Sequence, residues 1–220
     1  MIEQSRLGLR AHEVADLDPY KVRKIELQLE AEELIVKEEP REEVGKMYFT
    51  KEQKQQLEQQ GFQIYRLSGI TSNEMKGISF KYNFLRSGLR KLMNEKSMEG
   101  EVAIDPNNFF WQETAYKKYL EQAEIVLSNK NKRGVEGTRF IWGNVADYVE
   151  LSYLYFRRNT KPFGSLFKSD WARTSGPGPN LSVAIVTIKD NFVQFKFEDT
   201  DKMSENIKIA PLLIKDVQID

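Results

Sequence analysis

Residues 145–158 constrain the fold more than any other stretch of the chain. In helical order, their apolar side chains cover most of the circumference instead of one stripe. Asn144, followed three residues later by Asp147, matches a helix-starting capping box with Asp in the usual Glu position. A helix of this composition must be covered on nearly all sides, either by the rest of the chain or by a partner. Its apolar residues are Val145, Tyr148, Val149, Leu151, Leu154, Tyr155 and Phe156.

The last third of the chain has the pattern of β-structure. Residues 182–188 are apolar at nearly every position, which is typical of a strand in the interior of a sheet. Asp190 and Asn191 predict a two-residue hairpin turn, with a returning strand over residues 192–197. Residues 207–214 predict a final strand, and Pro211 indicates that this strand lies at a sheet edge or a bulge.

The middle of the chain alternates helices and strands. Thr50 and Gln53 form a capping box, which predicts a helix over residues 51–60 that Gly61 ends. Residues 114–132 predict the clearest amphipathic helix, with an apolar face that includes Tyr116 and a solvent-exposed polar face that includes Gln122. Further strands are expected over residues 62–67, with Phe62 and Ile64 on one face, and over residues 101–104 and 138–142. Together these elements predict an α+β fold, in which an antiparallel or mixed C-terminal sheet carries helices 114–132 and 144–158.

Residues 1–46 differ from the rest in being rich in acids and nearly free of aromatic residues. Asp18 and Pro19 suit the start of a helix, and Pro40 is expected to end it. We therefore expect a charged helical arm and linker over residues 1–46, followed by a single α+β domain over residues 47–220. The alternation within residues 24–36 leaves a β-hairpin open as the alternative for part of the arm.

Composition excludes several kinds of active site. The chain has no cysteine and one histidine, His12, so it has no disulfide, no thiolate nucleophile and no metal site that needs two imidazoles. Its 33 basic and 33 acidic residues balance, which argues against a surface tuned throughout for nucleic acid. The sequence starts without a secretory signal, and no apolar run approaches the ~20 residues that span a bilayer. We expect a soluble protein of the cytoplasm or of a virion, without membrane contact.

The remaining chemical motifs are weak. Prolines beside Gly176 and Gly178 remove the backbone N–H groups that a phosphate-binding loop needs. Asp199, Asp201 and Glu205 offer oxygen ligands for a cation, but they lack the glycine and the ligand count of a calcium loop, so a solvated turn is the alternative. We therefore expect no cofactor, no metal and no catalytic residue. A carboxylate-dependent hydrolase would draw on Glu113, Asp147, Glu150 and Asp170, which sequence spacing cannot pair.

Residues 157–173 interleave cations and aromatic rings, with Asp170 as the one acid. Exposed, this combination suits single-stranded nucleic acid, because cations follow phosphates and rings stack on bases. It also suits a protein interface, where arginine and aromatic residues dominate binding. The third interpretation is that the rings belong to the core and the cations merely flank them. The candidate contact residues are Arg157, Arg158, Lys161, Phe163, Phe167, Lys168, Trp171 and Arg173.

Short stretches spread over residues 51–214 resemble another group of proteins in their order along the chain and in their residue types. They are residues 58–64 with their Gln-Gln-Gly-Phe, and residues 102–106, 109–110, 134–135, 144–148, 150–151, 163–164, 172–174, 182–185 and 210–214. In these stretches the chain resembles a group of bacterial proteins of unassigned function. The resemblance misses residues 1–46, which implies that they are an added arm, and it implies no activity, cofactor or catalytic residue.

These observations favour a non-enzymatic interaction or assembly module within a larger intracellular or phage-like complex. A protein partner or self-association is expected, and the acidic arm meeting residues 157–173 is one hypothesis for it. An accessory nucleic-acid-binding protein is the first alternative, and the carboxylate-dependent hydrolase is the second.

Overall fold

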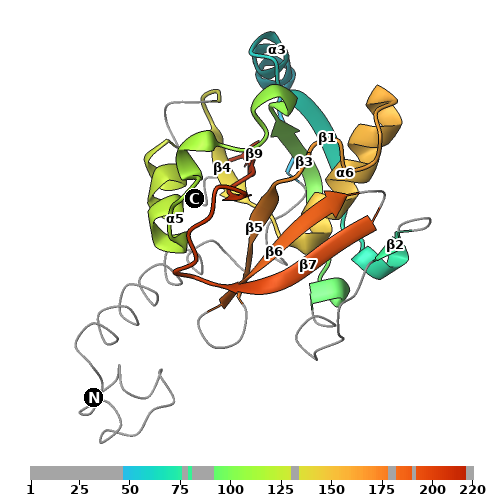
Figure 1. Cartoon of the computed structure of the whole chain (residues 1–220). Helices are drawn as coiled ribbons and strands as arrows, with labels where there is room; N and C mark the ends of the chain where they lie inside the picture. The colour runs from blue at the N-terminus through green and yellow to red at the C-terminus, as the bar shows by residue number, and fades with distance from the viewer. Residues whose placement is uncertain are drawn as a thin grey trace, which may run out of the picture. The chain divides into compact units, whose positions relative to one another are not determined.

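A computed structural model of the chain describes residues 47–75, 79–80, 92–129, 134–177, 182–189 and 192–216 (Figure 1). The predicted helical arm, its hairpin alternative and the Asp190–Asn191 turn lie outside the described residues. The helices are α3 (Lys51–Gln59), α5 (Tyr119–Ser128) and α6 (Val145–Asn159), with short 3-10 turns at Ser72–Glu74, Pro106–Asn108 and Gln112–Thr114. The strands are β1 (Gln63–Ser68), β2 (Ser79–Phe80), β3 (Glu99–Ile104), β4 (Thr138–Trp142), β5 (Trp171–Pro177), β6 (Ser182–Lys189), β7 (Phe192–Asp199), β8 (Ile207–Lys208) and β9 (Pro211–Lys215).

The strands form two sheets, and the α+β class is confirmed. One sheet has four antiparallel strands in the order β1-β3-β9-β4, and the other has five strands in the order β2-β7-β6-β5-β8. The five-stranded sheet is mixed, because its short outer strands β2 and β8 run parallel to their neighbours. It corresponds to the predicted C-terminal sheet, with β6 and β7 paired antiparallel along their whole length. The four-stranded sheet was not expected, since it joins strands from distant parts of the chain.

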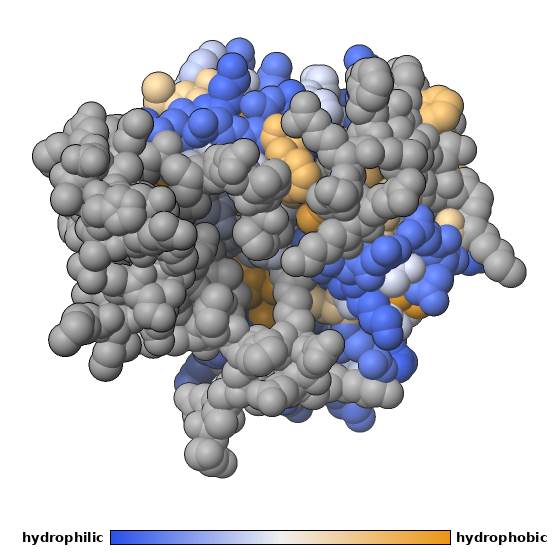
Figure 2. Space-filling view, turned by 90° about the horizontal axis from the view of Figure 1, so that it is seen from below, coloured by the Kyte–Doolittle hydropathy of each residue, from blue (hydrophilic) through white to orange (hydrophobic). Residues whose placement is uncertain are grey.

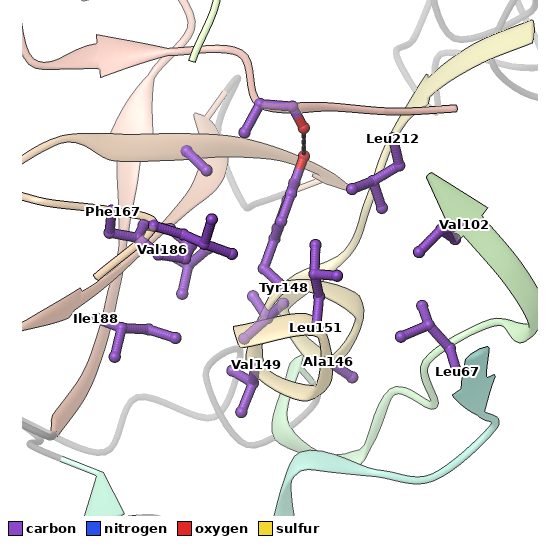
Figure 3. Packing of buried hydrophobic residues seen from close by; sticks show 14 of the residues in the cluster. Leu67, Val102, Ala146, Tyr148, Val149, Leu151, Phe167, Val186, Ile188 and Leu212 are labelled. Carbon is purple, nitrogen blue, oxygen red and sulfur yellow. Dashed lines mark hydrogen bonds between the residues drawn. The ribbon is translucent and has the colours of Figure 1, made fainter. Parts of the chain in front are cut away.

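Helix α6 is the centre of the fold, as its composition predicted. Every residue from Val145 to Ser152 is buried. On one side of the helix, Val149 and Tyr148 face Val186, Ile188 and Phe167, and on the other Leu151 and Ala146 face Leu67, Val102 and Leu212 (Figure 3). The helix therefore fills the space between the two sheets, which is why nearly its whole circumference is apolar. The predicted capping box is present, with Asn144 Oδ1 accepting from Asp147 N and Asp147 Oδ2 accepting from Asn144 N.

Two hydrogen bonds from α6 protect the outer edge of β1. Arg158 donates to the Ile64 carbonyl at 2.9 Å, and the Ser68 N–H donates to Glu150 at 2.9 Å. Glu150 and Arg158 are eight residues apart, a rise of about 12 Å along a helix, and Ile64 and Ser68 are four residues apart, about 13 Å along a strand. The two contacts therefore match in spacing. Helix α6 thus runs antiparallel to β1 and occupies backbone groups that another strand would use. The buried face of β1 is the one with Tyr65 and Leu67, and the alternate face with Phe62 and Ile64 is half-buried.

Helix α5 is shorter than predicted, and its buried side differs. Residues 112–114 form a 3-10 turn and the helix begins only at Tyr119, because Tyr116 has a left-handed backbone, with φ of +56°. Gln122, expected on the wet face, is buried, and its side-chain amide donates to the carbonyls of Thr114 and Ile207. Tyr116, expected on the apolar face, is 60% exposed.

The predicted strand over residues 207–214 is two strands in two different sheets. Residues Ile207–Lys208 pair with β5 in the five-stranded sheet, and Pro211–Lys215 lie between β3 and β4 in the other. The edge position predicted from Pro211 was wrong, because β9 is an interior strand. Pro211 is tolerated there as the first residue of its strand.

Seen from below, most of the visible described surface is hydrophilic, with small and separated hydrophobic areas (Figure 2). Large exposed apolar side chains are correspondingly few among the described residues. They are Tyr116, Leu127, Phe156, Phe192 and Met203. Within the described part of the chain, no helix is long and apolar enough to cross a membrane.

Candidate interaction surfaces

The predicted basic and aromatic segment divides between the core and the surface. Phe167 is fully buried, and its ring meets those of Phe109, Phe110 and Tyr148 edge to face at centroid distances of 5.6, 5.7 and 6.3 Å. Phe163 packs half-buried against the same core. Gly164, at φ +84°, allows the turn to approach β6, because a Cβ there would lie 2.4 Å from the Ile188 carbonyl oxygen. The interpretation that rings belong to the core therefore holds for these two phenylalanines.

The exposed residues of the segment lie mainly at the C-terminal end of α6. Arg157 and Arg158 are in its last turn, Thr160 ends it with a left-handed backbone, and Lys161 follows. Arg157 stacks over the Tyr153 ring at 5.9 Å, and Arg158 lies over the Tyr65 ring at 5.5 Å. We call Tyr153, Phe156, Arg157, Arg158 and Lys161 the α6 end. Its prediction as a partner contact stays a prediction.

Three further candidates lie elsewhere. Lys168 is exposed in the turn before β5. Trp171, at the start of β5, is half-buried, and the Lys196 ammonium lies 5.1 Å from the centre of its ring. Arg173, in the same strand, is fully buried. The structure therefore does not bring Lys168, Trp171 and Arg173 together with the α6 end into one exposed patch.

Arg173 instead anchors residues 200–206, the loop between β7 and β8. Its guanidinium donates to the Thr200 carbonyl at 3.3 Å and to the Lys202 carbonyl. Burial lowers the pKa of Arg173 to about 10, although nearby Tyr119 and acidic groups including Asp199 act in the opposite direction. The side chain thus stays charged at neutral pH, and hydrogen bonds to a charged donor are stronger than neutral ones.

The same loop is held at every second carbonyl. Besides the two bonds from Arg173, the Tyr119 N–H donates to Thr200 O at 2.9 Å, the Tyr116 N–H to Ser204 O at 3.1 Å and the Trp171 N–H to Asn206 O at 2.7 Å. Carbonyls 200, 202, 204 and 206 therefore all accept hydrogen bonds from the body of the domain. A loop fixed in this way presents its other groups in one conformation.

Tyr116 is the most unusual residue of this region. It combines an exposed ring with a left-handed backbone, which costs a non-glycine residue about 1–2 kcal/mol. Its hydroxyl donates to a Glu205 oxygen at 3.1 Å, and this hydrogen bond is the main reason why the pKa of Tyr116 is raised. Met203, in the same loop, is 54% exposed. We call Tyr116, Met203 and Glu205 the Tyr116 surface.

The carboxylates proposed for a hydrolase serve the fold. Asp147 and Glu150 are both buried, one turn apart on α6. Asp147 accepts from Asn144 N and Met98 N at 2.7 Å each, and Glu150 accepts from Ser68 N at 2.9 Å and from the Ser97 hydroxyl at 2.5 Å. The bond to Asn144 caps α6 itself, and the other three tie the start of α6 to the end of β1 and to the residues just before β3, so the pair acts as a structural clamp.

The other carboxylates do not converge either. Asp170 forms a largely buried ion pair with Lys208 at 2.9 Å, and Glu113 is exposed in the turn before α5. Asp199 accepts from the Asp201 N–H at 2.8 Å, as expected for a solvated turn. Within the described residues, no group of three or more acidic or histidine side chains is arranged to hold a metal ion.

No protein-family model, curated protein or solved structure matches this chain. The resemblance to bacterial proteins of unassigned function therefore stays a prediction. Sequence reasoning missed the Tyr116 surface, because the residues that hold Tyr116 lie almost ninety positions further along the chain. The sequence signal in this loop is its string of acids, Asp199, Asp201 and Glu205, which indicates a cation site or a solvated turn and not a binding surface.

Proposed function

We propose that this protein is a non-enzymatic binding module that docks on a protein partner through the Tyr116 surface. The observation that carries the proposal is the large, exposed and strained Tyr116 ring, which the domain fixes by two hydrogen bonds to the 200–206 loop. Strained backbone persists only where surrounding contacts hold it, and it is concentrated at functional positions.

The chemistry of the surface favours a protein as the partner. Tyrosine and methionine are enriched in the buried centres of protein interfaces, and tyrosine is among the residues that contribute most to binding. A ring that is already ordered loses little conformational entropy when it is covered. Charged groups surround it, since Lys117, Lys202 and Glu205 are all exposed, and a polar rim is typical of such interfaces. We further propose that the complex is intracellular or phage-like, an expectation that rests on the sequence alone.

Affinity isolation of the full chain from its native cells, at moderate salt and with or without nuclease, tests the proposal. Tyr116→Ser removes the ring, and Leu127→Ser is the matched control, because Leu127 is also exposed (46%) but lies at the far end of α5. We expect partners that survive nuclease, that are lost with Tyr116→Ser and that are retained with Leu127→Ser. Partners retained equally by both variants, or lost on nuclease treatment of the unaltered chain, would contradict the proposal.

A further inference from the structure

The α6 end carries an excess of positive charge that is not neutralised by ion pairs with the described residues. Arg66 of the adjoining strand β1 lies opposite Glu101 of β3, so it adds no net charge. Residues 151–167 contain Arg157, Arg158 and Lys161 and no acidic residue. In a chain whose formal net charge is zero, this is a local concentration of charge, and such a patch attracts polyanions.

Only some of these cationic side chains stabilise the fold. Arg158 bonds the edge of β1, and basic residues in a last helical turn also stabilise the helix through its dipole. Arg157 lies over the Tyr153 ring, and Lys161 lies beyond the helix. Both side chains are exposed, and neither forms an ion pair with any described residue.

Aromatic groups accompany the charges on the same surface. Phe156, immediately before Arg157, is 40% exposed, and the Arg157 guanidinium lies 5.9 Å from the centre of the Tyr153 ring. Guanidinium planes and aromatic rings both stack on nucleobases, while lysine and arginine follow phosphates. From this combination we infer that the α6 end binds single-stranded nucleic acid, without sequence preference.

This inference does not depend on the Tyr116 surface. In Figure 1, α5 and the C-terminal end of α6 lie on opposite sides of the domain, and Tyr116 lies three residues before the start of α5. The two surfaces can therefore be occupied at the same time. A protein partner at one and a nucleic acid at the other are separate results.

Fluorescence anisotropy of a labelled oligothymidylate with the full chain tests the inference, over a salt series. Arg157→Glu with Lys161→Glu changes the site, and Lys51→Glu with Lys189→Glu is the matched control, because all four lysines and arginines are exposed. Each lost phosphate contact reduces the salt slope of log K by about 0.7 for a single strand, so the site pair should reduce it by about 1.4. When the salt concentration is raised fourfold, the affinity of the site pair should therefore fall about sevenfold less than the affinity of the unaltered chain.

Two further measurements make the result specific. Phe156→Ala should weaken oligothymidylate binding about tenfold, because it removes a ring on which a base stacks. Polyglutamate should displace the oligothymidylate only weakly, since it has no bases. The inference would be overturned if the chain did not bind at low salt, or if the site and control pairs weakened binding equally. It would also be overturned if polyglutamate bound as strongly as the oligonucleotide and Phe156→Ala left binding unchanged.

Discussion

Replacing Tyr148 by Phe isolates one hydroxyl at the centre of the fold. Tyr148 is completely buried on α6, and its hydroxyl donates to the Ala210 carbonyl at 2.7 Å (Figure 3). The same hydroxyl accepts from the Gly143 N–H at 3.1 Å. Phenylalanine keeps the ring contacts with Phe109 and Phe167, at centroid distances of 6.4 and 6.3 Å. The substitution therefore removes two hydrogen bonds while leaving the packing of the core in place.

The magnitude follows from the two backbone groups left behind. Each buried polar group without a partner costs about 1–3 kcal/mol, so the loss of both partners should lower the free energy of unfolding by about 2–6 kcal/mol. For a domain of this size, the corresponding decrease in Tm is about 4–24 °C. Urea denaturation followed by circular dichroism measures the change, and the m-value should stay the same because the folded and unfolded states keep their exposed areas.

Tyr155→Phe is the control for this experiment. Tyr155 is half-buried on the same helix, and its hydroxyl makes no hydrogen bond with any described residue, so a change below about 0.5 kcal/mol is expected. If Tyr148→Phe also stayed within this limit, the two backbone groups would have found other partners. The argument that this hydroxyl joins α6 to Gly143, just after β4, and to Ala210, just before β9, would then be refuted.

Three other substitutions test the polar contacts. Glu150→Gln should destabilise the domain by about 1–3 kcal/mol in urea denaturation, because each carboxylate oxygen accepts one hydrogen bond and the amide nitrogen of Gln cannot accept one. An unchanged denaturation midpoint would show that the carboxylate does not act as a clamp. Arg173→Met should speed hydrogen exchange of the Tyr116 and Tyr119 amides, which donate to the 200–206 loop, and unchanged exchange would show that the guanidinium does not anchor it. Glu205→Gln should lower the pKa of Tyr116 toward its ordinary value near 10, as measured by ultraviolet difference titration against Tyr116→Phe. Because this pKa is raised in the folded chain, the bond stabilises the fold below pH 10 and is lost as pH rises through the folded pKa.

Local signals were the part of the fold that the sequence could predict. The capping boxes at Thr50 and Asn144 depend on residues three positions apart, and both are present as expected. The interior strand β6 and the enclosed helix α6 were predictable because burial on all sides requires apolar residues at every position.

Features set by distant contacts were not predictable. The amphipathic pattern over residues 114–132 could not reveal that the Tyr116 N–H bonds to Ser204, a contact that delays the start of α5. The apolar run over residues 207–214 could not show that its two halves pair in different sheets. For Arg173, nothing in the neighbouring sequence indicates that its charge would be buried beneath a loop that begins 27 positions later. The candidate contact residues divided between core and surface for the same reason.

The place of β9 has a consequence for how the protein is made. Residues 211–215 lie between β3 and β4, so the four-stranded sheet lacks an interior strand until they have left the ribosome. Until then the nascent chain holds two strands whose facing edges are open, and open edges pair readily with other chains. A nascent chain that ends before residue 211 therefore exposes two strand edges, and residues 211–215 close both edges at once when they pair with β3 and β4.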